Sequence, residues 1–296
     1  MQDDKKGCYL LLDVGGTNIK GSVFDLDDRK FSPIKEFPAE AKDSKDAIFD
    51  NFFNILTDLR ENRKIAGVGF GFPGPFDYER GISLMKNINK YDSIYGISFR
   101  EELGKRDKDL LECKMLFLHD VEAFAIGCAS YKNACHSGRA ICVCIGTGAG
   151  SAFLKDGKVV KDQRENVPEN GWIYNTPFND SIIDDYISVR GLERISKAIV
   201  GEKLNGYELF KRCNVNDPFA LEVYRIFGNM LFDALEPFIR DFCPDTLVFG
   251  GRISNSFSFF GKSVNDFCKE KNIKIILEED TSIRAMQGLL AQLEQL

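Results

Sequence analysis

The sequence predicts an α/β fold made of two lobes that repeat the same order of elements, β-β-β-α-β-α. Short apolar runs that end in glycine turns indicate buried strands, and longer segments with apolar residues three or four positions apart indicate amphipathic helices. The two kinds of segment follow each other in the same order in both halves of the chain. A length of 296 residues suits two domains, at about 150 residues each.

The first half opens with a buried strand and continues with further apolar runs. Its expected strands are Cys8–Val14, Ile19–Leu26, Phe31–Phe37, Ile65–Phe70 and Met115–Leu118. We expect Ser44 to cap a helix whose buried face carries Ile48, Phe52, Ile55, Leu56 and Leu59. A second helix is expected from Val121 to Tyr131.

The second half repeats this order. Its expected strands are Ala140–Ile145, Ser151–Leu154, Lys158–Val160, Thr246–Phe249 and Ile273–Leu277. Asp156-Gly157 is typical of a tight hairpin turn. Helices are expected near Ile182–Val200 and Pro218–Phe242 and in the tail Ser282–Leu296.

A local alignment supports the duplication. Gly15–Asp25 and Gly146–Asp156 each open on a glycine turn, contain a short Ser-x-Phe/Val core and close on an aspartate. Two such units facing each other would enclose a central cleft lined by glycine turns from both sides. We expect an N-terminal lobe of residues 1–119, joined by a C-terminal helix over 284–296, and a C-terminal lobe of residues 120–283.

The composition indicates a globular protein. Hydrophobic residues make up 44% and charged residues 28% of the chain, which excludes wholesale disorder and fibrous proteins. The net charge of -6 argues against nucleic acid as the main partner, because an acidic surface repels phosphodiester backbones. The nine cysteines are scattered, as is typical of reduced thiols. Neither a bilayer-spanning run nor a secretory signal is found, so we expect a cytoplasmic protein.

The motif Asp13-Val-Gly-Gly-Thr17 lies in a strand-turn-strand and is not followed by a helix. This placement does not fit a dinucleotide fingerprint. Glycines let a backbone approach a phosphate closely and aim N–H groups at it. Thr17 can add a hydroxyl, and Asp13 can hold a metal-bound water. The structural alternative is a plain hairpin with a glycine turn.

Two further glycine motifs occur in the second half. Gly146-Thr-Gly-Ala-Gly150 is a second glycine-rich hairpin like the one in the first half. Two hairpins suited to binding an anion are less likely to occur in one chain by chance than a single one. Gly250-Gly251 after a strand would let an adenine ring lie close to the backbone. The alternative for this pair is a tight turn without a ligand.

These motifs, in this order, resemble the ROK family of sugar kinases and related repressors. Leu12–Gly21 looks like the family's first phosphate motif, Gly69–Asp77 like its sugar-side loop, and Leu247–Ile253 like its adenosine motif. The resemblance implies an actin-like (ribonuclease H-like) fold, a glucokinase-like kinase, ATP with Mg²⁺, and a homodimer. It assigns the nucleotide contacts to Asp13, Gly15, Gly16, Thr17, Lys20, Gly146, Thr147, Gly148, Gly250 and Gly251.

The resemblance also places a catalytic base. The family's Asn-Asp-x-x-Ala pattern matches His119-Asp120-Val-Glu-Ala123, which assigns the base to Asp120. A carboxylate that accepts the proton of an attacking sugar hydroxyl typically contributes about 10²–10⁴-fold in rate. The structural alternative for Asp120 is the N-cap of the following helix. His119 replaces the family's Asn and stays a candidate for sugar contact.

A second departure removes the family's zinc motif. Pro168-Glu-Asn-Gly-Trp172 keeps Glu169 but has Trp172 in place of the histidine, and no cysteine follows over residues 173–212. Zinc needs about four N or S ligands, so we predict no structural zinc. Trp172 can stack on a sugar or pack in the core.

The remaining sugar-side candidates come from the resemblance. Asp184 falls where the family has a sugar-contacting Glu, and a solvated helix acid is the alternative. Asn87 falls near the family's sugar site, and a loop Asn in its own turn is the alternative. The other predicted sugar contacts are Gly71, Gly74, His119 and Glu169.

The sequence therefore predicts ATP-dependent phosphorylation of a hexose or an N-acylated amino sugar. A sugar-binding sensor that has lost turnover is the alternative, because His119 and Trp172 replace family residues. The resemblance implies an N-terminal DNA-binding module in a regulator of this family, and because the first phosphate motif begins about ten residues from Met1 we do not expect a regulator.

Overall fold

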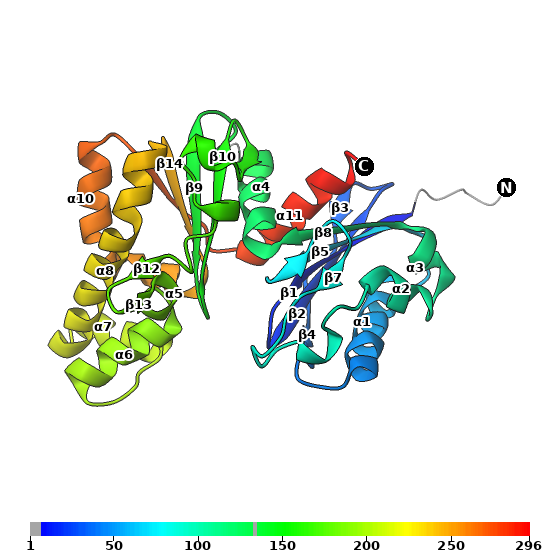
Figure 1. Ribbon diagram of the computed structural model, residues 1–296, viewed down its shortest axis with the longest axis horizontal. Coiled ribbons are helices and arrows are strands. Elements are labelled where there is room, and N and C mark those ends of the chain that lie inside the picture. Colours follow the sequence, from blue (N-terminus) through cyan, green and yellow to red (C-terminus); the bar gives the residue numbers. More distant parts are fainter. Residues whose placement is uncertain (1–6, 133–134) are drawn as a thin grey trace. The chain divides into compact units, whose positions relative to one another are not determined.

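The structure, a computed structural model, describes residues 7–132 and 135–296. Contacts divide the chain into two units, one running to Ser130 and completed by Ser282–Leu296, the other comprising Tyr131–Thr281 (Figure 1). The sequence predicts the first boundary earlier, after residue 119. The structure puts it later because helix α4 (Asp120–Lys132) packs within the first unit: a Cβ atom built on Gly71 would lie 3.7 Å from the Cα of Asp120.

The first unit is built on a mixed sheet with the strand order β3-β2-β1-β5-β8. Strand β1 pairs antiparallel with β2 and parallel with β5, which is parallel to β8. The bounds of the strands are Cys8–Val14 for β1, Asn18–Asp25 for β2, Lys30–Phe31 for β3, Lys35–Pro38 for β4, Ile65–Phe72 for β5 and Lys114–His119 for β8. A short hairpin of β6 (Phe76–Asp77) and β7 (Ile82–Ser83) follows β5.

The expected third strand is split. Strands β3 and β4 both pair with β2, at opposite ends of it. Pro33 lies between them and has no N–H to donate, so the backbone ladder is interrupted there. Residues 31–37 are therefore two short strands instead of the single strand that their apolar residues predict.

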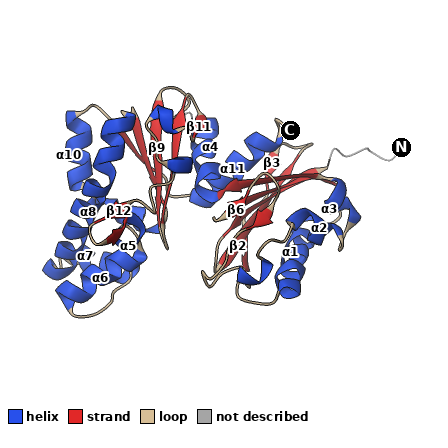
Figure 2. Cartoon of the chain, viewed as in Figure 1, coloured by secondary structure: helices blue, strands red, loops and turns tan. Residues whose placement is uncertain are grey.

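The second unit repeats the topology of the first, with the order β11-β10-β9-β14-β15. Each unit combines a sheet with helices (Figure 2). The pairing is the same in both sheets: β9 pairs antiparallel with β10 and parallel with β14, as β1 does with β2 and β5. The predicted duplication is confirmed. The bounds are Arg139–Ile145 for β9, Ala149–Lys155 for β10, Lys158–Val160 for β11, Thr246–Gly250 for β14 and Lys274–Leu277 for β15, with a separate hairpin of β12 (Pro177–Phe178) and β13 (Ser181–Ile182).

The helices follow the predicted order with additions. The first unit has α1 (Lys45–Arg60), α2 (Phe99–Gly104), α3 (Lys108–Glu112) and α11 (Thr281–Leu293) besides α4. The second unit has α5 (Ile183–Tyr186), α6 (Val189–Val200), α7 (Gly206–Asn214), α8 (Pro218–Phe242), α9 (Phe257–Phe260) and α10 (Lys262–Glu270). The helix expected over 182–200 is two helices, because Ser188 is fully extended between them. No helix in the described part of the chain has the length and apolar character needed to cross a bilayer.

Helix α1 shows why the first unit folds as the sequence predicts. The side chain of Ser44 accepts a hydrogen bond from the backbone of Ala47 and so caps the helix. Its buried face faces the sheet, and the five residues predicted for that face are all buried. The helix approaches the sheet closely at Gly21 in β2, where a built Cβ atom would lie 2.6 Å from a methyl carbon of Leu59.

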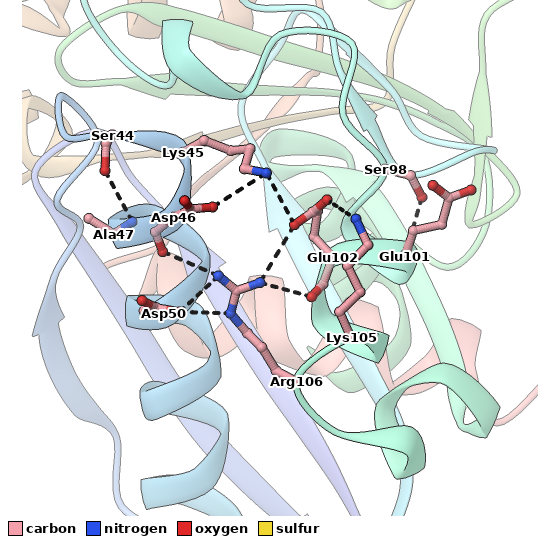
Figure 3. A network of polar contacts seen from close by, with 10 residues as sticks. All are labelled: Ser44, Lys45, Asp46, Ala47, Asp50, Ser98, Glu101, Glu102, Lys105 and Arg106. Atoms are coloured by element: carbon pink, nitrogen blue, oxygen red, sulfur yellow. Dashed lines mark hydrogen bonds and ion pairs between the residues drawn. The ribbon is translucent and has the colours of Figure 1, made fainter.

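A polar network joins α1 to α2 on the surface of the first unit (Figure 3). At its centre is Glu102, which is 7% exposed. Lys105 donates to Glu102 at 2.5 Å, and Lys45 and Arg106 approach it at 3.7 and 3.6 Å. These three cations lower the pKa of Glu102, with the hydrogen bond from Lys105 as the largest cause. Arg106 also pairs with Asp50 of α1, so the two helices share one set of charges.

Candidate active site

Three strands of the first unit end at the same edge of the sheet and bring candidate residues together. Asp13 pairs with Gly71 across β1 and β5, and Phe72 pairs with His119 across β5 and β8. Because these strands are parallel, their carboxyl ends lie side by side, where ligands usually bind in such sheets. Asp120 follows directly as the first residue of α4. The predicted base therefore lies at the same sheet edge as the first glycine motif.

The carboxylate of Asp120 is held by its own helix. Its Oδ1 accepts a hydrogen bond of 2.8 Å from the backbone N–H of Val121, and its side chain is 36% exposed. An N-cap residue bonds the second or third residue of a helix, whereas this bond goes to the next residue. The arrangement fixes the carboxylate and leaves it in contact with solvent.

His119 lies between the predicted sugar loop and Asp120. Its Nδ1 is 3.4 Å from Oδ1 of Asp120, and its side chain is 12% exposed. The ring of Tyr78 meets the imidazole edge-on at 6.0 Å, and Tyr78 donates its hydroxyl proton to the carbonyl oxygen of Phe72 at 3.0 Å. A Cβ atom on Gly74 would lie 3.8 Å from His119. Tyr78 and Gly74 thus fix the position of the imidazole.

Asp13 is the second acidic group at this edge. Burial raises the pKa of its carboxyl group, and the nearby charge of Asp120 raises it further. A hydrogen bond from the side chain of Ser282 and the charge of Lys20 act in the opposite direction. Lys20 is the residue opposite Asp13 in the β1–β2 hairpin.

The glycine turn between β1 and β2 is tightly closed. The N–H of Gly15 donates to the carbonyl oxygen of Asn18 at 3.0 Å, and a Cβ atom on Gly15 would lie 2.8 Å from that oxygen. Gly16 and Thr17 are exposed at the tip of the turn. Their backbone is accessible to an anion, as the predicted phosphate contact requires.

Asn87 lies in a loop of the same unit. It is exposed and has a left-handed backbone with φ of 61°. Asn tolerates this conformation better than most residues. The backbone of Asn87 therefore agrees with the alternative of a loop Asn in its own turn. Its predicted contact with sugar stays a prediction.

Two glycines let α4 and α11 cross with their backbones in contact. A Cβ atom on Gly127 of α4 would lie 1.8 Å from the carbonyl oxygen of Arg284, and one on Gly288 of α11 would lie 1.9 Å from that of Ala123. Only glycine fits at either place. The crossing therefore couples the helix that begins at Asp120 to the helix that carries Ser282.

The glycine hairpin of the second unit is held by an acidic residue. Asp184 accepts a hydrogen bond of 2.7 Å from the N–H of Ala149, and its carboxylate is paired with Arg190. Arg190 also donates to the carbonyl oxygen of Thr147 at 3.4 Å. A Cβ atom on Gly148 would lie 2.8 Å from the same carboxylate. Asp184, predicted to contact sugar, thus lies against the predicted phosphate hairpin.

Two other predicted sugar contacts lie together in the second unit. Glu169 is exposed at the start of the 3-10 turn Glu169–Gly171, which ends at Trp172. Trp172 is half-buried, and its ring centre is 6.1 Å from that of Tyr174. Burial and the charge of Asp184 raise the pKa of Tyr174. A half-buried indole beside an exposed phenol offers a surface on which a sugar ring can stack.

The Gly250-Gly251 turn requires a glycine at its second position. Gly251 has φ of 90°, and a Cβ atom there would lie 2.4 Å from the carbonyl oxygen of Ile145. The turn therefore brings the end of β14 against the backbone that leads into Gly146. The adenosine-motif glycines and the second phosphate hairpin are neighbours in this unit.

Comparison with known proteins shows the family. The family model described as "ROK family" matches residues 9–289. The chain belongs to the ROK family. An N-acetyl-D-glucosamine kinase of Mannheimia succiniciproducens is 27% identical over 264 residues, covering 82% of this chain and 83% of the relative.

Solved structures share the ROK fold. A glucokinase from Parabacteroides distasonis has a TM-score of 0.74 at 18% identity and covers 100% of this chain and 99% of its own. A ROK family glucokinase from Streptomyces griseus, solved with glucose and AMPPNP, has a TM-score of 0.74 at 16% identity and covers 98% and 100%. The predicted actin-like fold and the predicted class, an ATP-dependent carbohydrate kinase, are confirmed.

The site residues of this ROK chain suit Mg²⁺ better than zinc. Magnesium prefers carboxylate and water oxygens, and Asp13 and Asp120 lie close enough for one charge to raise the other group's pKa. A cation between them would relieve that repulsion. Within residues 7–132 and 135–296, no three His, Cys, Asp or Glu side chains gather as a metal site. The absence of structural zinc stays a prediction.

Three residues that contact predicted residues were not themselves predicted from the sequence: Tyr78 and Ser282 in the first unit, and Arg190 in the second. Tyr78 packs on His119, Arg190 pairs with Asp184, and Ser282 bonds Asp13. Arg190 lies in α6 and Asp184 in α5, so the two residues do not share one helix. Their spacing of six positions therefore gives no periodic pattern that would predict the contact. Ser282 is far from Asp13 in the sequence, and only the packing of α11 brings them together.

Proposed function

We propose that this ROK protein transfers the terminal phosphoryl group of ATP to a hydroxyl of N-acetyl-D-glucosamine or a closely related amino sugar. The sugar is suggested by the relatives, because kinases named for N-acetyl-D-glucosamine from several bacteria match more than four fifths of the chain. Their identities of 24–27% leave the sugar itself to be measured.

The observation that carries the proposal is the position of Asp120. Its carboxylate is partly exposed at the carboxyl ends of β1, β5 and β8, beside the glycine turn and Asp13. We assign acceptance of the hydroxyl proton to Oδ2, since Oδ1 is engaged by the N–H of Val121. The sugar oxygen then forms its bond to phosphorus as the bond to the leaving phosphate oxygen breaks.

Other residues would bind and orient. The N–H groups of Gly16 and Thr17 and the Gly146–Gly150 hairpin would hold phosphate oxygens. Asp13 would hold Mg²⁺ through water, and the ion would neutralise phosphate charge. His119 would contact the sugar, with its ring fixed by Tyr78. The homodimer, the cytoplasmic location and the lack of nucleic-acid binding stay predictions.

A panel of sugars tests the proposed substrate. ADP release is measured with ATP and glucose, mannose, N-acetyl-D-glucosamine or N-acetyl-D-mannosamine as acceptor. The proposal predicts the highest kcat/KM for N-acetyl-D-glucosamine. A clear preference for glucose would contradict the assigned sugar while leaving the kinase class intact. Sugar binding without turnover on the whole panel would contradict the proposed activity.

A further inference from the structure

A small pocket in the first unit lies beside the exposed glycine turn of residues 15–17. It is built from two loops, one after β4 and one before α2. Its lining residues are Ala41, Lys42, Asn89, Lys90, Asp92 and Ser93. None of them is among the residues that the sequence motifs or the family resemblance assign to a ligand.

Hydrogen bonds tie both loops to the glycine turn. Ala39 donates its N–H to the carbonyl oxygen of Thr17 at 2.9 Å, and the hydroxyl of Tyr91 donates to that of Gly15 at 2.9 Å. The two loops are joined by the bond from the N–H of Tyr91 to the carbonyl oxygen of Ala41 at 2.5 Å. The pocket therefore has a fixed position next to the turn, and all of its parts belong to one unit.

The charge of this pocket is positive. Its one acidic residue, Asp92, accepts backbone hydrogen bonds from Ile88 at 3.1 Å and Asn89 at 3.0 Å, which stabilise its negative charge locally. Among the residues that the structure describes, neither Lys42 nor Lys90 forms an ion pair with a carboxylate. Two lysines and one aspartate thus line the pocket, and among the described residues neither lysine is paired with that aspartate.

Lys90 reaches toward the glycine turn. A Cβ atom on Gly16 would lie 3.4 Å from the Cδ of Lys90, so the aliphatic part of the side chain lies on the turn. The ammonium group is two bonds beyond Cδ on a flexible chain and can contact an anion at the turn. A glycine turn that exposes N–H groups and a lysine lying on it form complementary parts of one phosphate site.

We propose that Lys90 and Lys42 form an anion subsite that binds a phosphate group next to the Gly15–Thr17 turn. The ligand class is a phosphate ester or anhydride. The phosphate group can belong to the phosphoryl donor or to the sugar phosphate formed by transfer. These two sources rest on the proposed kinase function, whereas the binding itself does not.

Direct binding of pyrophosphate tests the subsite without turnover. Isothermal titration calorimetry of the full chain is compared for the wild type, Lys90→Ala, Lys42→Ala and Lys90→Arg. Loss of one charge-assisted contact predicts about tenfold weaker binding for Lys90→Ala, a smaller loss for Lys42→Ala, and near wild-type binding for Lys90→Arg. Lys108→Ala removes the same charge from the exposed start of α3 and is the matched control, with unchanged binding expected.

Three results would overturn the subsite. The first is the absence of saturable pyrophosphate binding to the wild type. The second is equal binding by the wild type and the variant that combines Lys42→Ala with Lys90→Ala, provided that circular dichroism shows both to be folded. Lys108→Ala weakening binding as much as Lys90→Ala would also overturn it, because the effect would then be one of net charge.

Kinetics then identify the source of the phosphate. A higher KM for ATP in Lys90→Ala assigns the subsite to the donor, and weaker inhibition by the sugar phosphate assigns it to the product. Failure of the proposed function looks different from failure of the subsite. If no sugar is phosphorylated while pyrophosphate binding still depends on Lys90, the subsite stands and the kinase proposal is wrong.

Discussion

The carboxyl group of Asp13, at the end of β1, receives a hydrogen bond from the side chain of Ser282, in the first turn of α11. Ser282 is 7% exposed and belongs to the same unit as Asp13. Helix α11 packs on the sheet: a Cβ atom on Gly69 of β5 would lie 3.1 Å from Leu289. The helix therefore places its first turn against the acidic residue of the glycine motif.

Replacing Ser282 by alanine is expected to shift the pH dependence of activity. Burial raises the pKa of Asp13, and the bond from Ser282 lowers it, so removing the hydroxyl raises this pKa further. Asp13 must be ionised to hold a metal-bound water. The acidic limb of kcat/KM against pH should therefore move to higher pH in Ser282→Ala.

The control is Ser22→Ala. Ser22 is also buried in the first unit and donates to the carbonyl oxygen of Ser32 at 2.8 Å, away from Asp13. Its acidic limb should match that of the wild type. If Ser282→Ala lowers activity equally at all pH values, Ser282 does not act on the ionisation of Asp13.

Glu102 is expected to stabilise the first unit at pH values above the pKa of its carboxyl group. The surrounding cations lower the pKa of this buried carboxylate. A group whose pKa is depressed by folding adds stability above its unfolded pKa and loses it as the pH falls through the folded pKa. Glu102→Gln should cost about 1–2 kcal/mol near pH 7, and the difference should shrink in acid.

Thermal melts at several pH values measure this effect. Glu101→Gln is the matched control, since Glu101 is the neighbouring exposed residue on α2 (Figure 3). Its Tm should follow that of the wild type at every pH. An equal loss of Tm in Glu102→Gln at neutral and acidic pH would show that charge is not the cause.

Adding one methyl group at the crossing of α4 and α11 is expected to destabilise the protein. The Cβ of Gly127→Ala would overlap the backbone of Arg284 at 1.8 Å. Overpacking costs about 1–3 kcal/mol or more, and each kcal/mol lowers Tm by about 2–4 °C in a protein of this size. Activity should fall as well, because the displaced helix carries Asp120.

Gly206→Ala serves as its control. Gly206 is also helical, but a Cβ atom there would lie 3.7 Å from Leu192, an ordinary contact. This variant should be as stable as the wild type or slightly more so. A Gly127→Ala protein with an unchanged Tm would contradict the close crossing of the two helices.

Helices and strands with a regular apolar pattern and a glycine or proline at one end were predictable from the sequence. The bounds of β1 and α8 agree with the predicted Cys8–Val14 and Pro218–Phe242. The apolar run of β1 ends at a glycine turn, and α8 begins with a proline. Helices α2 and α3 were not predicted, since they are only six and five residues long and show no full period.

The candidate site was predictable where it follows strand ends. Asp13 and Asp120 each stand at the end of an apolar run, so their place at one sheet edge follows from parallel pairing. The contacts of Ser282 with Asp13 and of Tyr78 with His119 depend on tertiary packing, which sequence spacing does not encode. Asp184 shows the same limit: its bond to Ala149 joins two elements that are distant in the sequence.

The most direct test is the turnover of Asp120→Asn with ATP and N-acetyl-D-glucosamine, measured beside Asp28→Asn, which removes one charge from an exposed turn of the same unit. Loss of the base predicts that kcat falls about 10²–10⁴-fold while the Kd for the sugar and the Tm stay near those of the wild type, and that Asp28→Asn is fully active. Turnover of Asp120→Asn comparable to that of the wild type would contradict the assignment of Asp120 as the group that accepts the proton.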